Sequence, residues 1–97
     1  MTNAQADSHA EAIGDSREAN TVIADLTKNH PTANHSMLRQ HFHSIVSRFA
    51  AGDVKGGRMA LQAWTDREQF SDAEKKALAN ILGQVMQTAK ANGVKLH

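Results

Sequence analysis

Hydrophobic residues recur at helical spacing in three long stretches of the chain, separated by short polar breaks. In the first stretch the large apolar residues fall on one helix face about 100° wide; they are Leu38, Phe42, Ile45, Val46 and Phe49. In the third they cover a wider arc of about 140°, enough to contact two neighbours; they are Leu78, Ile81, Leu82, Val85, Met86 and Ala89. The pattern predicts helices over about 36–51, 54–67 and 72–92.

The breaks between these stretches carry the residues that end and begin helices. Gly52 suits the left-handed conformation that follows a helix end, and Asp53 can cap the next helix. Ser71 and Glu74 have the spacing of a capping box, in which each side chain accepts from the other residue's backbone N–H. Asn92-Gly93 is typical of a left-handed helix C-terminus. These signals place the helix boundaries independently of the hydrophobic pattern.

The first thirty-odd residues contain far less apolar surface. Val22, Ile23 and Leu26 lie at helical spacing, which predicts a short helix over 20–29 that forms only by docking, and His30-Pro31 ends it. Residues 1–19 read as a disordered acidic tail. The expected fold is therefore all-α: a small three-helix antiparallel bundle with an additional short N-terminal helix, within a helical domain spanning 20–94.

The middle helix has the least regular pattern. Its Gly56-Gly57 pair costs about 1 kcal/mol per glycine relative to alanine, which is tolerated where backbones approach closely. Met59 falls about 160° from Leu61, away from the packed face. An exposed methionine and a nearby Trp64 favour protein binding, although a residue at the position of Trp64 more often closes the end of the core. We predict a partner-binding site made of Lys55, Arg58, Met59 and Trp64.

The segment Phe49-Ala50-Ala51-Gly52-Asp53-Val54, followed by Ala60-Leu61, resembles the helical hairpin of tetratricopeptide-type repeats, in which a Gly-Asp turn joins two antiparallel helices. The resemblance covers about twenty residues. There is no second copy at the period of about 34 residues, and glycines stand where that family has helix formers. The resemblance implies an antiparallel pairing of the two helices and nothing about activity.

Charge divides the chain into two unequal parts. Residues 1–34 hold five acidic and two basic side chains, and residues 35–97 hold nine basic and five acidic ones. A basic domain could serve as a nucleic-acid-associated regulator with a helix-turn-helix-like hairpin, through Lys55, Arg58, Lys75 and Lys76. The basic residues are scattered rather than gathered in one stripe, so this function is the alternative and not the first choice.

Six histidines are present, and four of them fall between His30 and His43. The candidate metal ligands are His35, His41 and His43. No two of them have the i, i+4 spacing with which two histidines on a helix share an ion. The chain also lacks cysteine. We expect no metal site, and keep a metal- or pH-responsive module as a second alternative.

Catalytic signatures are missing from the sequence. There is no G-x-S-x-G motif and no phosphate-binding glycine loop, so we expect no enzyme activity, no catalytic residues and no cofactor. No stretch is apolar enough to span a membrane. The predicted function is a small cytoplasmic interaction or regulatory module that binds a protein partner through its helix faces and forms a homodimer.

Overall fold

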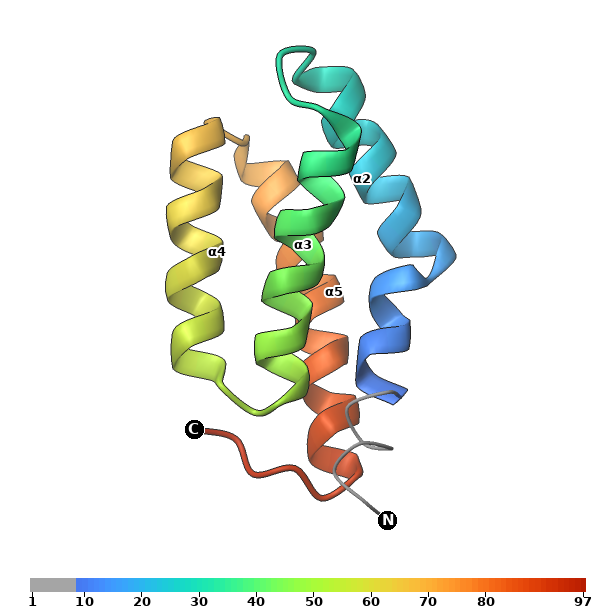
Figure 1. The fold of residues 1–97 in the computed structure, drawn as a ribbon, viewed down its shortest axis with the longest axis vertical. Coiled ribbons are helices and arrows are strands. Elements are labelled where there is room, and N and C mark those ends of the chain that lie inside the picture. Colours follow the sequence, from blue (N-terminus) through green and yellow to red (C-terminus); the bar gives the residue numbers. More distant parts are fainter. Residues whose placement is uncertain (1–8) are drawn as a thin grey trace.

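The computed structural model describes residues 9–97, and within this part the chain forms helices and no strands. Residues 9–12 are helical and continue into the short 3-10 helix η1 (Ile13–Asp15). Four α-helices follow: α2 (Arg17–Asn29), α3 (His35–Ala50), α4 (Val54–Glu68) and α5 (Asp72–Ala91). From α2 to α5 each helix runs opposite to the one before it (Figure 1). The all-α fold class predicted from the sequence is confirmed.

The three helices that pack mutually are α2, α3 and α5, and this differs from the expected trio of α3, α4 and α5. Helix α4 lies outside them (Figure 1), and its only extended helix contact in the described part of the chain is with α3. The reason is the apolar face of α2, where Ala19, Ile23 and Leu26 are all buried. The wide arc of α5 meets α2 and α3, and α5 also contacts η1.

In the N-terminal region, helical structure begins at lower residue numbers than the polar composition predicts. Helix α2 begins at Arg17 instead of residue 20, capped by Ser16, whose hydroxyl accepts from the Ala19 N–H at 3.2 Å. Ala10 is fully buried, and Gly14 lies against Val46. Small residues therefore allow close packing in a segment where no large apolar side chain predicts it. The rest of the expected tail, residues 1–8, lies outside the described residues.

The predicted helix ends are present. Gly52 adopts a φ of +89°, and the Asp53 carboxylate accepts from the Gly56 N–H at 2.9 Å. Both hydrogen bonds of the Ser71 and Glu74 capping box form. Gly93 also has a φ of +89°, and the backbone turns back after it toward the last turn of α5. Local sequence signals thus place these boundaries well.

The residues after α5 cover the start of α4. The backbone N–H groups of Val54 and Lys55 donate to the His97 carbonyl at 2.9 and 3.1 Å, and the His97 N–H donates to the Gly52 carbonyl at 2.8 Å. These are the N–H groups that a helix leaves without internal partners in its first turn. The C-terminal segment therefore serves as a backbone cap on α4.

Glu74 joins the end of α2 to the start of α5. Its carboxylate accepts from His30 Nε2 at 2.9 Å, from Asn29 Nδ2 at 3.3 Å and from the Ser71 N–H at 2.8 Å. Partial burial acts to raise the pKa of Glu74, but the hydrogen bonds from His30, Ser71 and Asn29 outweigh it and hold the pKa below its ordinary value of 4.5. The ionised form of Glu74 is therefore favoured by folding.

Glu74→Gln is expected to lower the free energy of unfolding by about 1–2 kcal/mol near pH 6, because the charged hydrogen bonds are lost. Glutamine still accepts from the Ser71 N–H, so the capping box survives. A carboxylate with a lowered pKa stabilises the fold above pH 4.5, and this contribution disappears as the pH falls through the folded-state pKa. Urea unfolding from pH 6 down to pH 2.5 should show the two proteins converging; a constant difference would contradict this account.

Candidate partner-binding groove

The structure places three of the four predicted partner-binding residues on the open side of α4. Lys55, Arg58 and Met59 are exposed, and Met59 is 66% exposed, the larger value of the two exposed large hydrophobic side chains in the described chain. Trp64 lies apart from them and is only 2% exposed. The open side exists because α4 packs extensively on α3 but not on α5, which leaves hollows lined by residues of α4 and α5.

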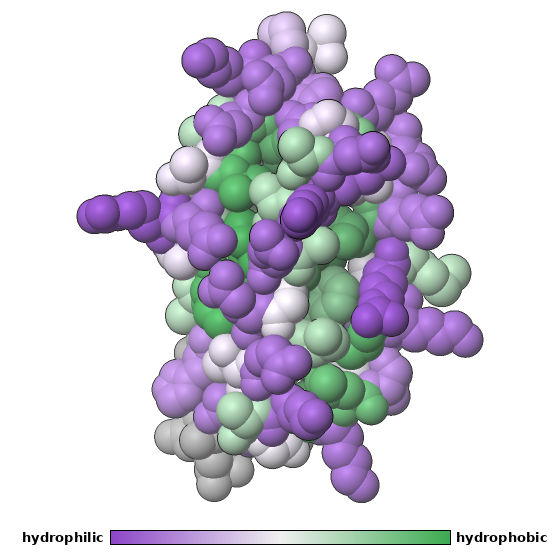
Figure 2. All heavy atoms as spheres, turned by 180° about the vertical axis from the view of Figure 1, so that it is seen from behind, coloured by the Kyte–Doolittle hydropathy of each residue, from purple (hydrophilic) through white to green (hydrophobic). Residues whose placement is uncertain are grey.

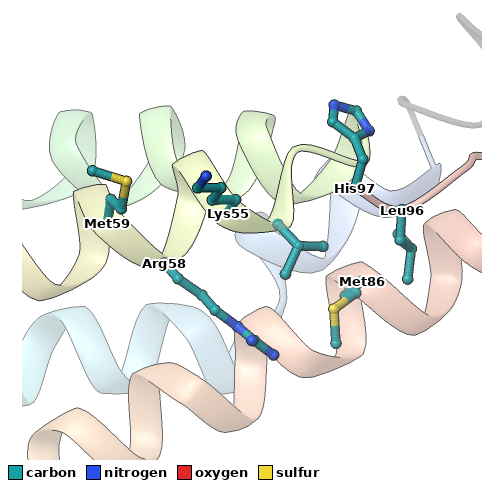
Figure 3. A pocket seen from close by; sticks show the side chains of 7 residues that line it. Lys55, Arg58, Met59, Met86, Leu96 and His97 are labelled. Atoms are coloured by element: carbon teal, nitrogen blue, oxygen red, sulfur yellow. The ribbon is translucent and has the colours of Figure 1, made fainter.

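Two hollows lie between α4 and α5 and meet at Arg58. The first has a volume of about 580 Å³ and is lined by Val54, Lys55, Arg58, Met59, Met86, Leu96 and His97. The second has a volume of about 430 Å³ and is lined by Arg58, Leu61, Gln62, Thr65, Asp66, Lys75 and Ala79. We call the two together the α4–α5 groove. Figure 3 shows Arg58 extending from α4 toward α5, near Met86.

The floor of the groove is apolar. Val54, Leu61, Met86 and Leu96 are each only partly buried, so they keep contact with solvent between the two helices. Seen from behind, where α5 lies in front of α3, apolar side chains show between charged ones (Figure 2). Partly exposed apolar side chains gathered in a concave surface are typical of an interaction site.

The rim of the groove is basic. Lys55, Arg58 and Lys75 line it, and Asp66 is the one acidic side chain among its lining residues. Within residues 9–97 none of these three cations forms an ion pair. Three arginines elsewhere do so: Arg39 with Asp15, Arg48 with Asp53 and Arg67 with Glu68. With three cations and one carboxylate, the lining of the groove carries a net positive charge.

Trp64 closes the end of the core between α3 and α4. Its ring packs edge-on against Phe70 with centroids 5.1 Å apart, and it stacks on His41 at 6.0 Å. Its indole N–H is buried without a hydrogen-bond partner in the described part of the chain. The sequence allowed two positions for Trp64, in the core or on a binding surface. In the structure Trp64 lies in the core, so it is not available to a partner in this conformation.

The histidines that cluster in the sequence each contact a different partner in the structure. His35 Nδ1 lies 3.1 Å from Thr27 Oγ1, Arg67 donates to His41 Nε2 at 3.3 Å, and His43 Nε2 lies 3.3 Å from Asp15 Oδ1. Across residues 9–97 no three His, Cys, Asp or Glu side chains come together in an arrangement that could hold a metal ion. Proximity along the chain therefore does not create a shared ligand set.

Several groove residues were not identified from the sequence. Met86 was assigned to the apolar face of α5 that packs in the core, and it lies at the edge of that face, half-buried beside the groove. Leu96 and His97 reach the groove only because the C-terminal segment folds back onto α4. The unusually wide apolar arc of α5 was the signal that could have indicated Met86.

Comparisons with known proteins identified no related protein. No protein family matches the chain, and neither curated proteins nor solved structures gave a match. Among the helices of the described residues, none has the length and apolar character needed to cross a membrane. Fold and site together define a small all-α protein with an open, basic-rimmed apolar groove.

Proposed function

We propose that this chain is a protein-interaction module that binds a partner through the α4–α5 groove. The observation that carries the proposal is the combination of exposed Met59 with the partly exposed floor residues Met86 and Leu96. Methionine adapts its shape to a partner at low cost, and it is frequent at surfaces that bind helices. A partner that covers these side chains would remove apolar surface from water.

The alternative of nucleic-acid recognition is weaker at this groove. A helix-turn-helix protein presents the N-terminal residues of its recognition helix to the bases, and free backbone N–H groups at a helix start bind phosphate. Here the N–H groups of Val54 and Lys55 already donate to the His97 carbonyl. Lys76, the fourth cation in that alternative, is not among the groove residues. These contacts favour a protein partner.

A homodimer through this groove is also less favoured than another partner. Symmetric pairing of two copies places the same patch on both sides of the interface. Lys55, Arg58 and Lys75 would then face their own copies across a closed interface, which like charges oppose. The expected homodimer and the expected cytoplasmic location stay predictions. The absence of enzyme activity likewise remains part of this proposal.

Met59→Asp is expected to abolish partner binding while leaving the helical content unchanged, because a carboxylate replaces an exposed apolar side chain in the groove. Partner capture from cells of the source organism, compared by quantitative mass spectrometry, should show at least about a tenfold loss of the groove partner, equivalent to about 1.4 kcal/mol. Circular dichroism checks the fold.

Met37→Asp is the matched control for this variant. Met37 lies on α3, is 57% exposed, and lines a separate hollow beside Trp64. The groove partner should be captured equally by the wild-type chain and by Met37→Asp. Equal capture of every partner by all three proteins would contradict a binding site at the groove.

A further inference from the structure

The groove can be assigned a class of partner, an inference that rests on the proposed function. We propose that the α4–α5 groove binds an acidic amphipathic helix, with its apolar side chains on the groove floor and its Asp and Glu side chains toward Lys55, Arg58 and Lys75. Three features of the groove lead to this occupant: its length, its apolar floor and its net positive charge.

The length of the groove suits a short helix. Its lining on α4 extends from Val54 to Asp66, which corresponds to about 18 Å along the helix axis. A helix of three to four turns has this length, and it presents anchors at positions i, i+3 or i+4, and i+7. The two hollows, joined at Arg58, offer successive sites for such anchors.

The distribution of charge selects an acidic occupant. Because α4 and α5 run in opposite directions, Lys55 lies near the start of α4 at one end of the groove and Lys75 near the start of α5 at the other. Arg58 lies where the hollows meet. Each exposed ion pair contributes little to affinity. Complementary charge along the whole groove nevertheless steers association and excludes basic partners.

A second folded copy does not supply this helix. Helix α2 lies in the acidic N-terminal region of the chain, but Ala19, Ile23 and Leu26 on its apolar face are buried in the core. Offering that apolar face to another molecule would require unfolding α2 from α3 and α5. The occupant is therefore a helix from a different protein.

A peptide-display selection tests the inference. A library of helix-forming 16-residue peptides is selected against the intact chain and counter-selected against Met59→Asp. The recovered peptides should carry apolar residues at i, i+3 or i+4, and i+7, and should be enriched in Asp and Glu on both flanks. The affinity of the consensus peptide should fall at least tenfold for the double variant Arg58→Glu/Lys75→Glu and should weaken as the salt concentration rises.

The double variant Arg17→Glu/Lys28→Glu is the control, since it makes the same charge change on exposed residues of α2 and should leave the affinity unchanged. A consensus that is neutral or basic but still requires Met59 would overturn the acidic helix and leave the proposed function standing. Equal weakening by both double variants would also overturn it. Failure to recover any peptide that distinguishes the wild-type chain from Met59→Asp would overturn the helical occupant, whereas loss of a captured partner by Met59→Asp would still support the proposed function.

Discussion

Trp64→Ala is expected to lower the free energy of unfolding by about 3–5 kcal/mol, the range observed when a buried aromatic residue is truncated. The side chain is 2% exposed and packs against Phe70 and His41, so its removal leaves a cavity between α3 and α4. A loss of this size is a large fraction of the stability of a small domain. Urea unfolding followed by circular dichroism measures it.

Met59→Ala provides the comparison on the same helix. Because Met59 is 66% exposed, its truncation should change the free energy of unfolding by less than about 0.5 kcal/mol. The two variants therefore separate the residue that holds α4 in place from the residue that we assign to the groove. Equal stability of Trp64→Ala and the wild-type chain would contradict the core position of Trp64.

Gly57→Ala is expected to destabilise the protein by about 1–3 kcal/mol, the usual effect of overpacking a core. A methyl group at this position would lie 2.8 Å from Phe49 Cε2 and 2.9 Å from Phe49 Cδ2. Phe49 is itself 4% exposed, so its ring has little room to move. This clash outweighs the gain of about 1 kcal/mol that alanine normally brings to a helix. Thermal and urea unfolding give the sign.

Gly83→Ala is the matched control in α5. Nothing lies within 4 Å of a methyl group built at Gly83, so only the helix propensity changes. This variant should be more stable than the wild-type chain by up to about 1 kcal/mol. Stabilisation by both alanines would show that Phe49 does not pack closely on the backbone of α4.

The helices with regular apolar faces could be predicted from the sequence, and so could their ends. The faces of α3 and α5 are evident from spacing, and Gly52, Asp53 and Gly93 adopt the roles that their residue types favour. These features depend on neighbours along the chain. A pattern of this kind shows which face is buried without showing which other face it meets.

The arrangement of the helices could not be predicted for that reason. Ala10 and Ala19 are fully buried, yet small residues give no signal in a hydrophobic pattern. The Gly56-Gly57 pair is explained by close contacts with two side chains and not by the expected approach of two backbones. Gly57 accommodates the Phe49 ring, and a methyl group at Gly56 would meet the carboxylate of Asp53.

The exposure of the candidate groove residues could be predicted in part. The periodicity of α4 indicated that Met59 points away from the packed face, and the side chain is exposed there. Trp64 has no such signal, because a tryptophan near a helix end occurs both in cores and at interfaces. The contribution of Leu96 depends on hydrogen bonds between residues far apart in the sequence, which no local pattern contains.

The methionine methyl groups offer the most direct test of binding in the α4–α5 groove. Met59 and Met86 line the groove, whereas Met37 lies by the separate hollow near Trp64. In a ¹³C-methyl NMR titration of the intact chain with the acidic consensus peptide, the signals of Met59 and Met86 should shift together and saturably while that of Met37 stays unchanged. A shift confined to Met37, or no shift at either groove methionine, would contradict the account.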